Sequence, residues 1–264
     1  MTAYQHITYE AADGVATLTM NRPDAFNGMT TRMLRETHIA LTAAAADRSL
    51  RVLQLTGAGR AFCPGADLKL NTSGGGDRDE PDRDATSRFQ VSVLLHEMPA
   101  LTIGAVNGAC AGAGFGWAAG CDIRVAARSA NFSTAFINVA VAGDMGLPWS
   151  LPRLVGAAKA RELSFLCEKF NAEEAQRIGF VAKVWDDAVF RDEVAALVAR
   201  MAAKSPVALR TLKAHYVAAE RMGFSEYIAL ETERHSRIVT SEDTREAFLA
   251  FVEKREPRFK NTGA

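Results

Sequence analysis

The stretch from Met98 to Cys121 constrains the fold more than any other part of the chain, because it is uncharged and carries a glycine at every fourth position. These glycines are Gly104, Gly108, Gly112, Gly116 and Gly120. The spacing is typical of packed membrane helices. However, a glycine-rich segment is a poor helix former and offers few large apolar groups to lipid. We therefore expect no membrane association, and tight backbone packing inside a soluble core.

Charge and cysteine usage exclude several classes of protein. Lys+Arg and Asp+Glu both total 31 among 264 residues, so no net positive field exists to hold nucleic acid. The cysteines form no C-x-x-C pair and the histidines show no metal-ligand spacing, so we expect neither a disulfide framework nor a metal site. The N-terminus lacks the order of a signal peptide, and the composition favours a reducing, cytoplasmic location.

Hydrophobic periodicity predicts an α/β N-terminal part followed by helices. Asp13-Gly14 separates two alternating segments and indicates a hairpin. We expect strands at 7–10, 15–20, 52–56, 101–106 and 121–127, and helices at 31–46, 152–166, 172–178, 187–203, 206–221, 224–238 and 241–254. The polar run 71–87 is expected to be a loop, either a plain insertion or a lid over substrate.

Two motifs offer backbone N–H groups at strand-to-helix junctions, where such groups lack intrahelical partners and can point at an anion. The first is Arg60-Ala-Phe-Cys-Pro-Gly-Ala-Asp-Leu-Lys69, which on its own is better explained as a capped helix start. The second is Asn107-Gly-Ala-Cys-Ala-Gly-Ala-Gly-Phe-Gly116, whose glycines permit a tight turn. A dinucleotide-binding fingerprint fits it poorly, since Trp117 stands where the third glycine is required.

Together with three further segments, these motifs resemble the crotonase (enoyl-CoA hydratase/isomerase) superfamily over essentially the whole chain. Asn21-Arg-Pro-Asp-Ala-Phe-Asn27 is similar to the family's Asn-Arg-Pro-x-x-x-Asn loop. Residues 121–132 resemble its following strand, and 251–255 resemble its last helix. The resemblance implies an α/β fold: a crotonase-like spiral of ββα turns over residues 1–200, with a C-terminal helical region over 201–264 that forms a homo-trimer or hexamer.

The resemblance also implies an acyl-CoA thioester substrate and no cofactor beyond the coenzyme A of that substrate. The thioester oxygen would lie between the backbone N–H groups of Ala66 and Ala113, an oxyanion hole that stabilises an enolate. The nucleotide contacts would fall on Ala25, Phe26, Pro64, Asp67, Leu68 and Lys69, with Phe251 and Lys254 supplied by a neighbouring subunit. Lys69 and Lys254 are also plausible as solvated charges, and Phe251 as an ordinary core residue.

The sequence departs from the hydratase pattern at both catalytic glutamates, whose positions hold Gly116 and Phe136. Hydration needs one carboxylate to activate water and another to handle the α-proton, so efficient hydration is not expected. Asp144 aligns instead with the aspartate of dienoyl-CoA isomerases, ring 1,2-epoxyphenylacetyl-CoA isomerases and 4-chlorobenzoyl-CoA dehalogenases. The epoxide isomerases are the closest local match. Asp122, the other acidic residue nearby, is expected to be structural, as a local cap.

The leading hypothesis is an acyl-CoA double-bond isomerase in which Asp144 moves a proton and the hole holds the enolate oxygen. We expect an apolar acyl pocket lined by Phe89, Gly116, Trp117, Phe136 and Met145, although a place in the core is the default for each side chain. Three alternatives remain open: a nucleophilic Asp144 in a dehalogenase or hydrolase, a residual hydratase, and a catalytically idle acyl-CoA binder.

Overall fold

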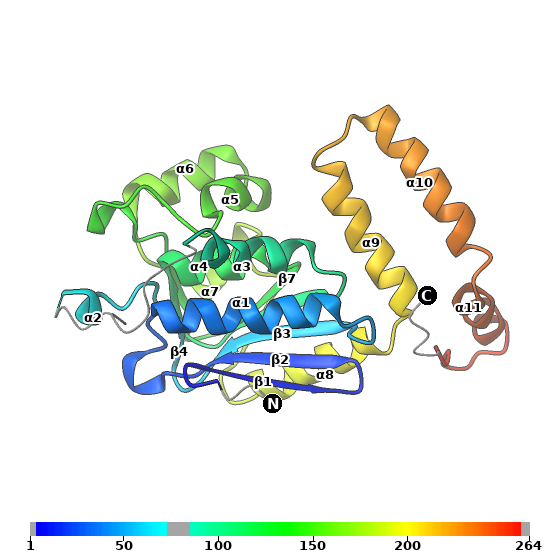
Figure 1. The fold of residues 1–264 in the computed structure, drawn as a ribbon, viewed down its shortest axis with the longest axis horizontal. Coiled ribbons are helices and arrows are strands. Elements are labelled where there is room, and N and C mark those ends of the chain that lie inside the picture. The colour runs from blue at the N-terminus through cyan, green and yellow to red at the C-terminus, as the bar shows by residue number, and fades with distance from the viewer. Residues whose placement is uncertain (1–3, 73–84, 260–264) are drawn as a thin grey trace.

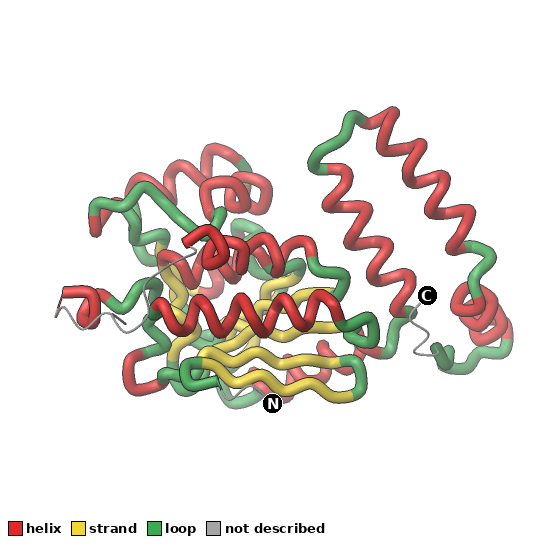
Figure 2. Tube along the Cα trace, viewed as in Figure 1, coloured by secondary structure: helices red, strands yellow, loops and turns green. Residues whose placement is uncertain are grey.

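The computed structural model describes residues 4–72 and 85–259. Residues 73–84, most of the polar run 71–87, lie outside the described residues. The expected loop was wrong at both ends of the run, because 71–72 and 85–87 belong to helices. Two sheets with helices packed around them form the core, and the C-terminal helices extend away from it (Figures 1 and 2). No helix in the described ranges is both long and apolar enough to cross a bilayer.

The larger sheet has the strand order β1-β2-β3-β5-β7-β10. Its strands are β1 (Ile7–Ala12), β2 (Val15–Met20), β3 (Val52–Gly57), β5 (Leu101–Val106), β7 (Ile123–Ala127) and β10 (Lys183–Trp185). β1 and β2 form the predicted antiparallel hairpin, and the remaining neighbours are parallel. All five predicted strands are therefore confirmed, with small differences at their ends.

A second sheet of short strands runs beside the first in the order β4-β6-β8-β9. Its strands are β4 (Ala61–Cys63), β6 (Ala109–Ala111), β8 (Asn131–Ser133) and β9 (Phe170–Asn171). β4, β6 and β8 each follow a strand of the larger sheet along the chain, and helices come after each pair. This repetition is the predicted spiral of ββα turns, which is confirmed.

Backbone packs directly against backbone where the short strands begin and end. A Cβ placed on Gly57 would collide with the carbonyl oxygen of Ala61, one on Gly108 with that of Arg60, and one on Gly114 with that of Cys63. The contacts of Gly108 and Gly114 join one turn of the spiral to the one before it, whereas that of Gly57 lies within a turn. The expected role of the glycine-rich stretch, tight backbone packing in the core, is confirmed.

The helices of the core lie close to their predicted positions, except over residues 85–97, where no helix was predicted, and over 147–166. They are α1 (Thr31–Ala46), α2 (Leu68–Thr72), α3 (Ala85–Glu97), α4 (Gly112–Gly120), α5 (Leu147–Val155), α6 (Ala157–Leu166), α7 (Ala172–Arg177) and α8 (Phe190–Ala202). The single helix predicted over 152–166 was wrong, since the structure has α5 and α6. Gly156 divides them with a φ of 81°, a left-handed value that interrupts a helix and that glycine adopts without strain.

The last three helices are α9 (Pro206–Ala219), α10 (Phe224–Ile238) and α11 (Glu242–Val252). A buried ion pair fastens α9 to the core: Lys213 Nζ lies 2.8 Å from Asp122 Oδ2 and also donates to the carbonyl oxygens of Leu95 and Ala100. The same Asp122 oxygen accepts the backbone N–H of Thr102. Asp122 is therefore structural, as expected, but its partners are distant in sequence rather than a local cap.

Candidate active site

The two predicted N–H-bearing junctions lie side by side. Gly65, in the turn between β4 and α2, has a φ of 97°. A Cβ placed on it would lie 3.4 Å from Ala113 N and 3.5 Å from Gly112 Cα. Ala66 and Ala113, some 45 residues apart in the sequence, are thus brought to the same place by the pairing of β4 with β6.

The N–H groups of Ala66 and Ala113 have no hydrogen-bond acceptor among the described residues. Ala66 lies in a β-bridge with Met29, where Met29 N–H donates to Gly65 O and Asp67 N–H donates to Met29 O, so the bridge leaves Ala66 N–H unused. Ala113 is the second residue of α4, where N–H groups lack intrahelical partners and the helix dipole favours negative charge. This geometry can hold an anionic oxygen.

Two buried or half-buried amide side chains fix the loops that carry these donors. Asn27 Nδ2 donates to Ala61 O at 2.7 Å and to Ala58 O at 2.9 Å. Asn107 Nδ2 donates to the same Ala61 oxygen, while its Oδ1 accepts Gly57 N–H at 3.1 Å. Neither amide was predicted to have a role, although both stand within the motifs 21–27 and 107–116; their hydrogen bonds hold the turn before β4 in place.

Asp67 has a structural partner. Its carboxylate lies 2.9 Å from Arg22 Nη1 and accepts Leu70 N–H at 3.1 Å. Burial raises the pKa of Asp67, but these hydrogen bonds and the Arg22 charge outweigh it and hold the pKa below its ordinary value. The pair joins the Asn-Arg-Pro loop to the start of α2. Contact with coenzyme A stays a prediction for this residue.

The other predicted nucleotide contacts of the core form an exposed rim around the same junction. Phe26 and Leu68 are 42% and 51% exposed, and Ala25, Pro64 and Lys69 are partly or fully open to solvent. The guanidinium of Arg60 stacks over the Phe26 ring at 4.3 Å, which adds a basic group that the sequence analysis did not assign. Exposed apolar side chains beside a cation could contact the base of a nucleotide and its phosphates, so this rim is compatible with the predicted nucleotide contacts.

Phe251 and Lys254 are not brought to this site within one chain. Phe251 lies in the last turn of α11 and Lys254 follows the helix. This helix lies at the far end of the molecule from α2 (Figure 1). Phe251 is 86% exposed, so it is not an ordinary core residue of this chain. Its predicted contact across a subunit boundary remains a prediction.

Asp144 lies in the loop between the short 3-10 helix η2 (Ile137–Val139) and α5. Its carboxyl group is half-buried, and Oδ1 is buried with no hydrogen-bond partner among the described residues. This burial raises the pKa of Asp144 above the ordinary value of an aspartate. The loop touches α4, since the Asp144 carbonyl oxygen would lie 3.4 Å from a Cβ on Gly116.

The charge of the Asp144 carboxylate affects the pKa of Cys63, which lies on the strand that leads to Ala66. Burial raises the pKa of the Cys63 thiol to about 12, and the Asp144 charge adds to the rise. Cys63 ends β4, three residues before Ala66. Burial likewise raises the pKa of Cys110. Both thiols therefore stay protonated at neutral pH.

The predicted pocket residues fall into three groups. Phe136 lies at the hole, with Cε1 3.8 Å from a Cβ placed on Gly112. Met145 is buried against Gly116. Trp117 is fully buried within the core and its Nε1 has no partner in the described part of the chain, whereas Phe89 on α3 is 51% exposed. Of these side chains, Phe136 and Met145 lie beside α4, which carries Ala113, and a role in an acyl pocket stays a prediction.

Comparison with known proteins agrees with this geometry. A family model described as enoyl-CoA hydratase/isomerase matches residues 10–262. A "1,2-epoxyphenylacetyl-CoA isomerase" of Escherichia coli is 36% identical, covering 93% of this chain and 95% of that protein. A "Probable enoyl-CoA hydratase" of Rhodobacter capsulatus is 35% identical, covering 97% of this chain and 98% of its own length.

Solved structures give the same result. The crystal structure of a putative enoyl-CoA hydratase from Streptomyces coelicolor superposes with a TM-score of 0.91 at 31% sequence identity, covering 99% of this chain and 96% of that chain. The spiral fold, the paired N–H junctions and these similarities lead to one conclusion. The chain belongs to the enoyl-CoA hydratase/isomerase family, the crotonases.

Proposed function

We propose that this protein is an acyl-CoA double-bond isomerase with Asp144 as its single acid–base group. The enzyme binds a 3-enoyl-CoA with its thioester oxygen between the N–H groups of Ala66 and Ala113. Asp144 removes a proton from C2, which gives a dienolate with C1–C2 and C3–C4 double bonds, and the oxyanion hole stabilises its negative oxygen. Return of the proton to C4 gives the 2-enoyl-CoA, and the aspartate is regenerated.

The observation that carries this proposal is the buried, unpartnered Oδ1 of Asp144. A carboxylate without a hydrogen-bond donor is a stronger base than one held by backbone N–H groups. Its raised pKa brings it nearer to the range useful for proton transfer at neutral pH. Met145, the next residue, is buried against Gly116, in keeping with the burial that raises the pKa of Asp144.

The absence of a second carboxylate favours isomerisation over hydration. Gly116 and Phe136 occupy the positions where hydratases of the family carry glutamates. One group can both remove and return a proton in isomerisation, whereas addition of water needs a second group to activate the water. The relatives include proteins named as hydratases and proteins named as isomerases, so the choice between the two activities rests on these residues.

A nucleophilic Asp144 is the second candidate, because the same unpartnered oxygen could attack an acyl-CoA carbon. Single-turnover reaction in ¹⁸O-labelled water distinguishes the two roles. Label in the Asp144 carboxylate, detected by peptide mass spectrometry, would establish the nucleophile. A base leaves the carboxylate unlabelled.

The direct test is turnover of an acyl-CoA panel in D₂O. The panel contains 3-enoyl-CoA and dienoyl-CoA thioesters, crotonyl-CoA and 1,2-epoxyphenylacetyl-CoA, the last chosen from the name of the Escherichia coli relative. We expect double-bond migration with deuterium incorporated at C2 or C4. Binding of acetyl-CoA without turnover of any member would instead support the idle binder.

A further inference from the structure

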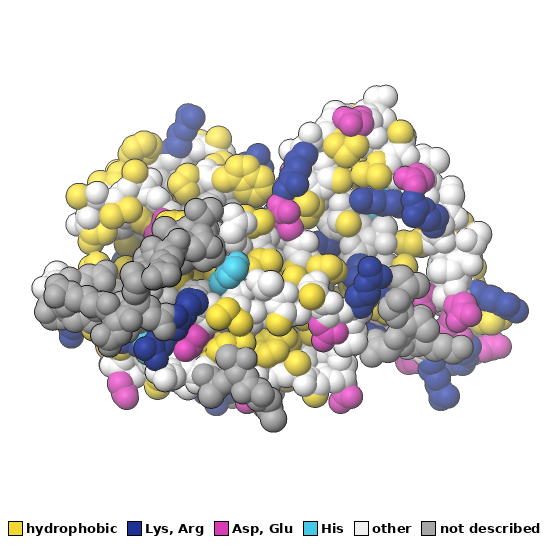
Figure 3. All heavy atoms as spheres, in the orientation of Figure 1, with side chains coloured by type: hydrophobic (Ala, Val, Ile, Leu, Met, Phe, Trp, Pro, Cys, Tyr) yellow, Lys and Arg dark blue, Asp and Glu magenta, His cyan; other side chains and the backbone are white. Residues whose placement is uncertain are grey.

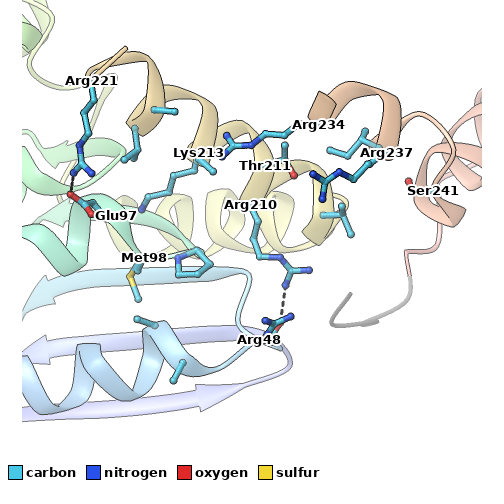
Figure 4. A pocket seen from close by; sticks show the side chains of 18 residues that line it. Arg48, Glu97, Met98, Arg210, Thr211, Lys213, Arg221, Arg234, Arg237 and Ser241 are labelled. Carbon is cyan, nitrogen blue, oxygen red and sulfur yellow. Dashed lines mark hydrogen bonds and ion pairs between the residues drawn. The ribbon is translucent and has the colours of Figure 1, made fainter. Parts of the chain in front are cut away.

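A cavity of about 1060 Å³ lies between the core and the C-terminal helices. The ends of α1 and α3 form one wall, through Ala45, Met98 and neighbouring residues, while α9 and α10 form the other (Figure 4). This cleft is separate from the candidate active site, since its lining includes none of the residues assigned there.

The cleft is strongly basic. Six lining residues are cationic and one, Glu97, is acidic. The cationic residues are Arg48, Arg210, Lys213, Arg221, Arg234 and Arg237. In the space-filling view, Lys and Arg side chains gather along the border between the core and the C-terminal helices (Figure 3). A protein with equal numbers of basic and acidic residues has concentrated positive charge here.

Half of these cations already have carboxylate partners. Lys213 pairs with Asp122, Arg221 with Glu97, and Arg237 with Glu233. Arg48, Arg210 and Arg234 have none within ion-pairing distance among the described residues. The Asp243 carboxylate acts on Arg210 through its charge, without an ion pair in the described part of the chain, so the cleft retains much of its positive charge.

Two of these arginines also have buried donors without acceptors. Arg210 Nη1 donates to Arg48 O at 2.8 Å, but Arg210 Nη2 has no partner in the described ranges. Arg234 Nη1 is likewise buried and unpartnered. A buried N–H of a charged group without an acceptor is costly. Desolvation and the charges of Arg48 and Arg51 lower the pKa of Arg210, as expected where like charges crowd together.

Arg210 and Arg234 lie on neighbouring helices of one wall, α9 and α10, and Arg48 lies on the other wall. Arg234 and Arg237 extend from α10 toward α9, and Arg210 extends from α9 toward Arg48 at the end of α1 (Figure 4). An anion held between them would join three helices. A phosphate group suits the arrangement better than one carboxylate, because it carries more acceptor oxygens, and planar guanidinium groups pair well with them.

We propose that this cleft binds a phosphate-class oxyanion through Arg210 and Arg234, with Arg48 adding charge at its mouth. The site would lie outside the acyl-CoA site and link the C-terminal helices to the core. Bound anion would pair with these guanidinium groups and stabilise the position of α10 against α9.

The test is calorimetric titration of the full-length protein with sodium pyrophosphate and with inorganic phosphate, at constant ionic strength set by chloride. Saturating acetyl-CoA is present throughout, so that phosphate subsites for coenzyme A are filled. We expect pyrophosphate to bind and to raise Tm. In the double variant Arg210→Gln/Arg234→Gln, the affinity should fall at least about tenfold, since each charge-assisted hydrogen bond contributes substantially.

The matched control is Arg191→Gln/Arg200→Gln, which removes two exposed arginines from α8, away from the cleft. It should bind pyrophosphate as the wild type does. Arg210→Lys/Arg234→Lys keeps the charge and should retain part of the affinity, which guards against loss through misfolding.

Absence of binding heat with the wild type would overturn the proposal, as would equal weakening in both glutamine double variants. If phosphate compounds do not bind but Arg210→Gln/Arg234→Gln changes the molar mass in light scattering, the cleft receives carboxylates from a second copy instead. Failure of acyl-CoA turnover would not bear on these outcomes, because the readout is anion binding.

Discussion

Met145 occupies the space beside Gly116: a Cβ placed on Gly116 would lie 2.6 Å from Met145 Cβ and 3.1 Å from Met145 O. The Asp144 loop can therefore approach α4 only because position 116 has no side chain. Two departures from the hydratase pattern, the missing glutamate on α4 and the aspartate at 144, are thus linked in space. The glycine makes room for the segment that carries the proposed base.

Gly116→Ala should lower isomerase activity while leaving the protein folded. The new methyl group would displace the Met145 segment and with it Asp144, and a misplacement of about 1 Å can cost roughly 10²-fold in rate. Gly120→Ala on the same helix is the control, because its Cβ would meet nothing closer than Ser92 O at 3.4 Å. Steady-state kinetics beside circular dichroism decides; equal activity of the two variants would contradict the link.

Crotonyl-CoA hydration by the wild type should be weak compared with isomerisation of a 3-enoyl-CoA. The double variant Gly116→Glu/Phe136→Glu should not become a hydratase, since a glutamate at 116 collides with Met145. Absorbance of the conjugated thioester monitors both reactions. Efficient hydration by the unmodified protein would show that the family's glutamate positions are misassigned here.

Much of this architecture could be predicted, because its signals are local. Alternation and Asp13-Gly14 predicted the β1–β2 hairpin, and the glycine spacing indicated backbone packing. Glycines in their own turns indicate the two N–H junctions, whereas the resemblance to a family pointed to Ala66 and Ala113 within them. The resemblance to a family then related them to one another, which periodicity alone could not do.

The features that were missed depend on contacts between distant segments. Nothing near Lys213 in the sequence shows that it is buried against Asp122. The shared acceptor of Asn27 and Asn107, the Ala61 carbonyl, is likewise visible only after folding. The break at Gly156 was not predicted, because the residues on both sides are good helix formers and one glycine inside a helical pattern is often tolerated.

Lys213→Met should destabilise the protein by about 3 kcal/mol, the lower end of the cost of breaking a buried ion pair. The lower end is expected because Asp122 is 23% exposed and can recover some hydration. Lys204→Met removes an exposed lysine nearby in the sequence and should change stability little. Urea unfolding of the two variants measures the difference; similar midpoints would show that the pair contributes nothing net.

The protein should be an oligomer of three or six subunits. Phe248, Phe251 and Val252 on α11 are 63%, 86% and 78% exposed, and apolar area of this kind favours association. Light scattering at micromolar concentration measures the molar mass. Phe248→Glu/Phe251→Glu should reduce it by placing charge on the same surface. A wild type that remains monomeric would contradict the prediction.

Asp144→Asn should reduce isomerase turnover by roughly 10²–10⁴-fold, because it preserves shape and removes the base. Affinity for acyl-CoA should change little, since Ala66 and Ala113 are untouched. Asp192→Asn, on the exposed start of α8, is the matched control and should retain full activity. Survival of turnover within a few-fold would make Asp144 a turn residue.

Thermal melts on the same variant distinguish a base from a turn residue by their pH dependence. Burial raises the folded-state pKa of Asp144 above its unfolded value, so the folded protein holds that proton more tightly and ionisation costs stability as pH rises. Asp144→Asn should therefore keep or raise Tm at pH 7, and this difference should vanish below roughly pH 4, the unfolded pKa of an aspartate. Wild-type kcat/KM should fall on the acid side as pH drops through the raised pKa. A turn residue predicts the reverse: activity retained at pH 7 and Tm lowered by loss of the native carboxylate.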